Sequence, residues 1–153
     1  MTAITLKTLE DTQAFAQRLG ALLEVGDVIL LKGLVGAGKT ELTRSVIQHL
    51  LPPHLKEEAV PSPTFTLVQT YDTTPPIWHL DLYRLKNPEE VWELGLEEGL
   101  TQATLFIEWP ENMGNLKFQN TLTLTLSLDD DQKTRHLDLS GTGTWQNRLN
   151  RLA

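Results

Sequence analysis

Alternating apolar and polar positions predict β-strands in four segments of the chain. Near the start, Ile4 and Leu6 alternate with polar neighbours, which is typical of a short strand. Residues 65–71 alternate in the same way. Residues 121–128 alternate hydroxyl side chains with leucine, and residues 133–139 follow them after three consecutive aspartates. We expect these last two segments to pair as an antiparallel hairpin with one buried face.

Short apolar runs predict further strands at residues 28–31, 77–81 and 104–108. The first run is an uninterrupted Val-Ile-Leu-Leu. Such a run fits a strand that is buried on both faces, as in a parallel sheet.

Helical spacing of apolar residues predicts helices among these strands. Residues 11–23 carry one apolar face, and residues 39–51 form a second helix that ends at two prolines. Residues 88–94 predict a third helix, with proline in its first turn and acidic residues at its positive end. Residues 145–152 suggest a short closing helix. The alternation of strands and helices indicates an α/β layered fold, and 153 residues suit a single domain, residues 1–153.

The strongest chemical signal is a complete phosphate-binding loop. Residues 33–40 (Gly-Leu-Val-Gly-Ala-Gly-Lys-Thr) match the pattern G-x-x-x-x-G-K-[ST]. The glycines let several backbone N–H groups point into one hollow, and the following helix adds its positive end. Lys39 is expected to reach the β- and γ-phosphates, and the Thr40 hydroxyl to ligate Mg²⁺. The nucleotide-binding candidates of this segment are Gly36, Ala37, Gly38, Lys39, Thr40 and Glu41.

Two acidic residues end apolar strands. Asp81 closes the run 77–81 and Glu108 closes the run 104–108. Parallel sheets place ligands beyond the carboxyl ends of their strands, so both side chains are expected at the nucleotide edge. A phosphate-loop protein needs a carboxylate to hold Mg²⁺ or to orient the attacking water. We therefore predict that these two acids act in catalysis together with Lys39.

Two neighbours of these acids have simpler interpretations. His79 has no second histidine at metal-ligand spacing, which favours a packed or supporting residue over a metal ligand. Trp109 follows Glu108 directly and suits the core, the rim of the site or a stacking platform. We include Trp109 among the nucleotide-binding candidates.

Three functions are compatible with a phosphate-binding loop of this kind. An ATPase is favoured over a GTPase because the base-reading Asn-Lys-x-Asp motif is absent from the sequence. A small-molecule kinase usually sets several arginines over the transferred phosphate, and of six arginines here only Arg84 follows a candidate catalytic strand. The third possibility is a nucleotide-gated binding module whose hydrolysis is slow.

The composition of the chain limits which binding partners and which cellular location we expect. The net charge of −7 gives no strong long-range attraction to nucleic acid. The sequence has no cysteine, which excludes a disulfide scaffold and a thiol nucleophile. We also expect no membrane span and no secretory signal, so the expected location is the cytoplasm.

Five segments in this order resemble the TsaE (YjeE) family. Residues 62–67 (Ser-Pro-Thr-Phe-Thr-Leu) and 79–84 (His-Leu-Asp-Leu-Tyr-Arg) are specific to this resemblance, as are residues 107–111 (Ile-Glu-Trp-Pro-Glu). The other two are residues 36–40 of the phosphate-binding loop and residues 93–95 (Glu-Leu-Gly).

The resemblance implies a P-loop NTPase-like, three-layer α/β fold. Its sheet would be mixed and mostly parallel, with helices on both faces and a C-terminal antiparallel hairpin. The resemblance further implies Mg²⁺-dependent ATP hydrolysis in support of threonylcarbamoylation of adenosine 37 (t6A) in tRNAs that read ANN codons. The implied partners are the TsaB and TsaD proteins, with tRNA reached indirectly through their complex.

The resemblance also implies individual roles. Glu108 lies on the Mg²⁺ side of the site together with Thr40, and Asp81 is a second catalytic acid. Thr64 and Thr66 lie in a switch-like loop near the γ-phosphate, and Thr12 corresponds to a position that contacts the nucleotide base.

The sequence departs from the family pattern beside the phosphate contacts. Leu34 stands where an acidic residue is usual, Glu41 where a second threonine is usual, and Ser45 where glycine is frequent. These departures concern local polar contacts and the fit to partners more than nucleotide binding.

Overall fold

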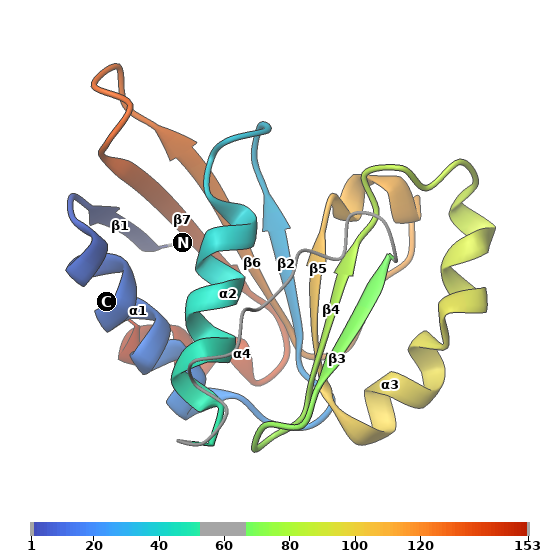
Figure 1. Cartoon of the computed structure of the whole chain (residues 1–153). Helices are drawn as coiled ribbons and strands as arrows, with labels where there is room; N and C mark the ends of the chain where they lie inside the picture. Colours follow the sequence, from blue (N-terminus) through green and yellow to red (C-terminus); the bar gives the residue numbers. More distant parts are fainter. Residues whose placement is uncertain (1, 53–66, 153) are drawn as a thin grey trace.

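The computed structural model describes residues 2–52 and 67–152. Within these residues the strands form one seven-stranded sheet in the order β1-β7-β6-β2-β5-β4-β3 (Figure 1). The strands are β1 (Thr2–Leu6), β2 (Val28–Lys32), β3 (Val68–Tyr71), β4 (Ile77–Asp81), β5 (Thr104–Glu108), β6 (Thr121–Leu128) and β7 (Arg135–Gly141). The strand that leads into the phosphate-binding loop, β2, therefore lies at the centre of the sheet.

Strand directions confirm the expected mixed, mostly parallel sheet. β2 pairs in parallel with β5 and β6, and β4 pairs in parallel with β5. β1 is antiparallel to β7, and β7 is antiparallel to β6. β1 therefore points the same way as β2, β4, β5 and β6. Only β3 and β7 among the described strands run the other way. The β6–β7 pair is the expected C-terminal hairpin, with Leu128 opposite Arg135.

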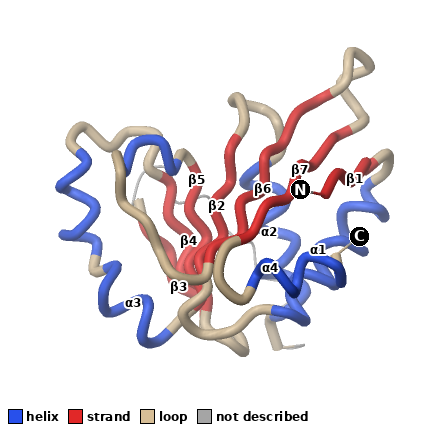
Figure 2. The backbone as a smooth tube through the Cα atoms, turned by 180° about the vertical axis from the view of Figure 1, so that it is seen from behind, coloured by secondary structure: helices blue, strands red, loops and turns tan. Residues whose placement is uncertain are grey.

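Helical segments cover both faces of the sheet, which gives the expected three layers (Figure 2). The α-helices are α1 (Leu9–Leu22), α2 (Lys39–Leu50), α3 (Leu96–Gln102) and α4 (Trp145–Arg148). The 3-10 helices are η2 (Pro88–Leu94), η3 (Pro110–Met113) and η4 (Leu149–Arg151). Side chains of α1, α2 and α4 form one apolar core with one face of the sheet, and those of η2 and α3 form a second core with the other face.

The apolar run in β2 serves both cores. Ile29 and Leu31 pack on the side of α1 and α2, whereas Val28 packs on the side of η2 and α3. All three side chains are fully buried. The expectation that this run forms a strand buried on both faces is therefore confirmed.

Most predicted element bounds hold, and two differences have local causes. β7 begins at Arg135 instead of residue 133 because Asp131 Oδ1 accepts hydrogen bonds from the backbone N–H groups of Lys133 and Thr134, both at 2.8 Å, which holds these residues in the turn. β3 begins at Val68 because Leu67 before it has a left-handed backbone, with φ of +65°. Residues 65 and 66 of the predicted strand lie outside the described part of the chain.

The sequence did not predict α3, and the helix predicted at 88–94 is a 3-10 helix. Gly95 separates the two with φ of +83°. Gly99 lies inside α3 because a side chain there would collide with the ring of Trp78 on β4, whose nearest atom would be 2.7 Å from its Cβ. A glycine in so short a segment weakens the helical pattern, so close packing on the sheet decides this element.

A buried ion pair fastens the C-terminal segment to the start of β2. Arg148 on α4 donates hydrogen bonds to both carboxylate oxygens of Asp27, at 2.8 and 2.6 Å, and a third to the carbonyl of Leu22 at 2.7 Å. Asp27 is 1% exposed. This contact joins residues more than one hundred positions apart at the end of the sheet opposite the phosphate-binding loop.

No helix in residues 2–52 and 67–152 is both long enough and apolar enough to span a bilayer.

Candidate functional site

The phosphate-binding loop connects β2 to α2 in a conformation that needs glycine. Gly38 caps α2 with φ of +103°, and Gly33 has φ of +142°. A Cβ atom on Gly33 would lie 2.5 Å from the carbonyl oxygen of Leu126 on β6. The loop therefore turns back tightly against the sheet and directs the N-terminal end of α2 at the space above the strand ends. Such a helix end favours anions because its first N–H groups are unpaired.

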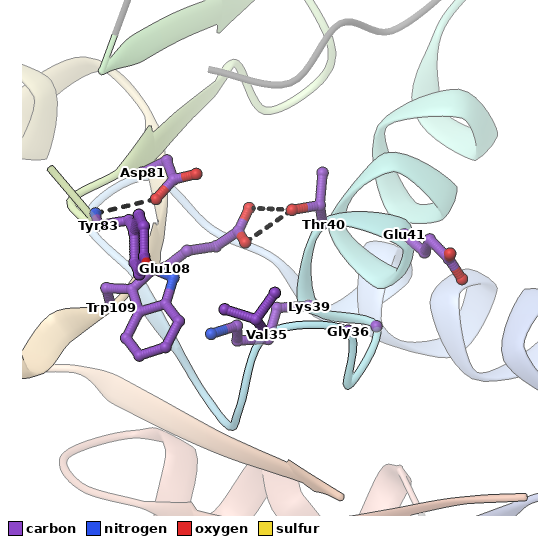
Figure 3. Close-up of a pocket in the computed structure, with 10 residues that line it drawn as sticks. Val35, Gly36, Lys39, Thr40, Glu41, Asp81, Tyr83, Glu108 and Trp109 are labelled. Atoms are coloured by element: carbon purple, nitrogen blue, oxygen red, sulfur yellow. Dashed lines mark hydrogen bonds between the residues drawn. The ribbon is translucent and has the colours of Figure 1, made fainter. Parts of the chain in front are cut away.

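A cleft of about 350 Å³ opens in front of this loop. The volume lies within the range expected for small-molecule sites. The structure gathers most of the predicted site residues around it (Figure 3). Those that line it are Gly36, Gly38, Lys39, Thr40, Glu41, Asp81, Glu108 and Trp109.

Lys39 lies within the loop at the bottom of this cleft. Its Nζ atom donates a hydrogen bond to the carbonyl of Gly33 at 2.6 Å and lies 3.4 Å from the ring centre of Trp109. Burial lowers the pKa of this ammonium group, and the nearby carboxylates of Glu108, Glu111 and Asp81 oppose that shift. A partly desolvated ammonium group is stabilised strongly when an anionic phosphate approaches it.

Thr40 and Glu108 are directly connected. Thr40 Oγ1 lies 2.7 and 2.9 Å from the two carboxylate oxygens of Glu108 (Figure 3). The single hydroxyl proton is thus donated to the carboxylate, and the lone pairs of Oγ1 remain available. Glu108 is 2% exposed, so this contact is shielded from water.

His79 is the second partner of Glu108. Its Nε2 atom lies 2.5 Å from Glu108 Oε2, and its side chain is 1% exposed. His79 is opposite Phe106 across the parallel β4–β5 pair, and Glu108 lies two residues beyond Phe106 on the same face. Sequence reasoning favoured a packed or supporting role for His79, and the structure places it against the acid at the end of β5.

Asp81 lies beside Glu108 at the ends of two neighbouring strands, since the two residues are directly paired across β4 and β5. Its Oδ1 atom accepts a hydrogen bond from the backbone N–H of Tyr83 at 3.0 Å. Asp81 is 5% exposed. Both acids therefore line the cleft in front of the phosphate-binding loop, at the carboxyl ends of their strands.

These residues fit Mg²⁺ better than a transition metal. The hydroxyl oxygen of Thr40 and the carboxylates of Glu108 and Asp81 are hard oxygen donors. In the described part of the chain no group of three or more histidine, cysteine or acidic side chains is placed to hold a metal alone. Mg²⁺ suits such a site because it takes one or two protein ligands and completes its shell with water and substrate phosphates.

Trp109 forms one wall of the cleft. The backbone here is left-handed, with φ of +57°, as β5 turns into η3. The indole ring lies against Lys39 and packs on Tyr83, with ring centres 5.0 Å apart and planes inclined by 50°. Of the roles open from the sequence, the structure places this ring at the rim of the cleft.

The remaining candidates lie in different places. Thr12 is 4% exposed and lines a neighbouring hollow of about 300 Å³ instead of the main cleft. Glu41 lines both spaces, and its carboxylate forms an ion pair with Arg135 at 2.5 Å between them. Ala37 is buried within the loop, where its N–H donates to the carbonyl of Leu34. Thr64 lies outside the described residues.

Sequence reasoning missed Arg135 and Tyr83. The guanidinium of Arg135 lies within 2.9 Å of where a Cβ on Gly38 would be, although 97 positions separate the residues. Tyr83 lines the cleft two residues after Asp81, where its place in the segment His-Leu-Asp-Leu-Tyr-Arg was a usable signal. For Arg135 no local signal existed because the pairing of β7 brings it to the loop.

Comparisons with known proteins agree with this site. The family model for threonylcarbamoyl adenosine biosynthesis protein TsaE matches residues 6–137. A Rickettsia bellii protein named tRNA threonylcarbamoyladenosine biosynthesis protein TsaE is 41% identical over 84% of this chain and 88% of its own length. A Streptomyces coelicolor protein of the same name is 33% identical over 83% of this chain and 88% of its own.

A solved structure is similar over nearly the whole chain. The crystal structure of Bacillus subtilis YdiB superposes with a TM-score of 0.74 at 26% sequence identity, covering 99% of this chain and 94% of that one. This similarity supports the P-loop-like fold, and the family match confirms the resemblance found in the motifs. The chain belongs to the TsaE family of threonylcarbamoyl adenosine biosynthesis proteins.

Proposed function

We propose that this chain is an Mg²⁺-dependent ATPase, acting as one domain over residues 1–153, that supports formation of t6A at adenosine 37 of tRNAs reading ANN codons. Its family has a role in t6A biosynthesis. The observation that carries the ATPase proposal is the contact of Thr40 with Glu108 beside Lys39, at the N-terminal end of α2. That arrangement joins an anion site to an oxygen-rich cation site.

In this proposal each residue of the cleft has a role in binding or hydrolysing ATP. The backbone N–H groups of the loop and Lys39 bind the β- and γ-phosphates. Thr40 and Glu108 hold Mg²⁺, which neutralises phosphate charge when bound. The carboxylate of Asp81, which lines the same cleft, orients the attacking water. Trp109 limits water access from one side and contributes to nucleotide binding.

We place the purine base in the hollow beside Thr12. This hollow adjoins the main cleft across Glu41, and Arg135 brings a cation to it. A nucleotide whose phosphates lie in the loop can extend past Gly38 into this space.

The protein partners in this proposal are TsaB and TsaD. Within the chain, Thr64 is proposed to sense the γ-phosphate.

Two properties support indirect contact with tRNA in the cytoplasm. The net charge of −7 disfavours this chain as the main tRNA-binding surface, so TsaB and TsaD would carry that contact. The pathway acts on tRNA, which fits a cytoplasmic ATPase.

Phosphate release tests the proposal against the kinase alternative. We expect slow release from Mg-ATP by the chain alone and faster release when purified TsaB and TsaD are added. The kinase alternative predicts transfer of labelled γ-phosphate to a metabolite and no effect of these proteins. In the described residues that line the cleft, Lys39 is the only lysine or arginine, which favours the ATPase.

The two acids are expected to differ in effect. Glu108→Gln should weaken Mg²⁺-dependent ATP binding and lower hydrolysis, because its carboxylate orients Thr40. Asp81→Asn should lower hydrolysis about 100-fold, as expected for loss of a group that orients or deprotonates water, with ATP affinity nearly unchanged. Calorimetric affinity and steady-state hydrolysis measure both effects. Wild-type hydrolysis by both variants in the presence of TsaB and TsaD would contradict the assignment.

A further inference from the structure

Glu108 is a buried carboxylate that accepts hydrogen bonds from two side chains. Thr40 donates from α2, and His79 donates from β4 at 2.5 Å. The side chains of His79 and Glu108 are 1% and 3% exposed. Loss of a donor to a buried carboxylate is costly, because hydrogen bonds to charged groups are the stronger ones and a buried group is poorly solvated.

The donors form a directed chain. Thr40 gives its only proton to Glu108, and this direction fixes where the lone pairs of its oxygen point. Mg²⁺ requires near-octahedral geometry, so the direction of those lone pairs decides how well Thr40 serves as a ligand. The orientation of the Glu108 carboxylate in turn depends on its other partner, His79.

The ring of His79 directs its Nε2 atom at Glu108. Its Nδ1 atom is buried and has no hydrogen-bond partner in the part of the chain that the structure describes. A proton on Nε2 leaves only a lone pair unpaired at Nδ1, whereas the opposite tautomer would bury an unpaired N–H. His79 lies on β4 between its two neighbouring strands, where it is paired in register with Gln69 of β3 and Phe106 of β5.

We propose that His79 is a positioning residue for the cation side of the site. It fixes the carboxylate of Glu108 through Nε2–H, and Glu108 then aims the Thr40 oxygen at Mg²⁺. This inference rests on the proposed function, because it assumes that Mg²⁺ binds between Thr40 and the nucleotide phosphates. His79 itself touches neither the cation nor the nucleotide.

A matched pair of amide substitutions tests this proposal. In His79→Gln the amide nitrogen reaches about as far as Nε2 and restores a donor to Glu108. In His79→Asn the amide nitrogen lies closer to the backbone and falls short. Both variants bury a neutral amide, so their stability costs are similar, and thermal unfolding verifies that each is folded. His79→Leu serves as a donor-free variant if it folds.

Calorimetry measures the affinity for ATP twice, once in EDTA and once in excess Mg²⁺. The quantity compared between variants is the ratio of these two affinities, which is the gain in ATP affinity from Mg²⁺. We expect His79→Asn to lose about tenfold of this gain, in line with loss of one charge-assisted hydrogen bond, while its affinity in EDTA stays at the wild-type value. His79→Gln should recover the gain to within about threefold.

Three outcomes separate the claims. A wild-type Mg²⁺ gain in folded His79→Asn overturns the positioning role. Equal losses of affinity in EDTA and in Mg²⁺ also overturn it, because a purely structural role would act on both. Failure of the wild-type chain to bind ATP in either condition contradicts the proposed function itself.

Discussion

Lys39→Ala should lower kcat/KM for ATP hydrolysis about 1,000-fold while the protein stays folded. Lys39 is the only cation among the described residues of the cleft, so no other side chain there replaces its charge at the β- and γ-phosphates. Removing one donor aimed at developing charge typically costs 100- to 1,000-fold, and Lys39 also contributes to binding of the ground state. ATP affinity should therefore fall as well.

The folded state should tolerate this change. Burial lowers the pKa of Lys39, which means that folding desolvates its charge at some cost. Alanine removes that cost together with the bond to the Gly33 carbonyl. Calorimetry with ATP measures the loss of affinity, and thermal unfolding measures the change in stability.

Lys32→Ala is the matched control, because Lys32 is an exposed lysine at the end of β2. Wild-type affinity and hydrolysis in Lys39→Ala would exclude the loop as the ATP site.

Arg148→Met should reduce the free energy of unfolding by about 3–5 kcal/mol, the usual cost of removing one partner from a buried ion pair. The remaining Asp27 carboxylate is 1% exposed and would lose two hydrogen bonds from the guanidinium. Arg148 also donates to the Leu22 carbonyl, so this bond between α4 and the rest of the molecule is lost together with those to Asp27. Its stacking on Trp145 within α4, 3.9 Å from the ring centre, is lost as well.

Urea denaturation measures this stability change. Arg151→Met is the control, since Arg151 is exposed in η4 and surface substitutions usually shift stability by no more than about 0.5 kcal/mol. The double variant Asp27→Asn, Arg148→Met should recover part of the loss, because it leaves no buried charge unpaired. A change within the control range for Arg148→Met would show that the ion pair contributes little to folding. ATP affinity should remain unchanged, since this ion pair lies at the opposite end of the sheet.

Sequence reasoning located most of the site because its signals are local. The phosphate-binding loop is contiguous and its glycines meet a backbone requirement that Gly33 and Gly38 show directly. Asp81 and Glu108 were identified from a simple rule: acids that end parallel strands arrive at the same edge. The structure pairs these two residues in register. Their catalytic roles stay predictions.

The places where local reasoning failed are those that depend on packing between distant segments. α3 has a weak pattern, and Gly99 is explained only by the ring of Trp78 against it. Thr12 and the main cleft are separated by the ion pair of Glu41 with Arg135, whose partners are 94 positions apart. No spacing rule connects such residues.

By itself, then, the sequence determined the α/β class, the phosphate-binding loop, the acids at the strand ends and the family. The tertiary structure alone decided the strand order, the hollow beside Thr12 and the contact of His79 with Glu108. The physical reason is the range of the interactions. Backbone conformation and apolar periodicity act between neighbours in the chain and leave a pattern there, whereas a buried hydrogen bond across two strands is decided only when the sheet brings its donor and acceptor together.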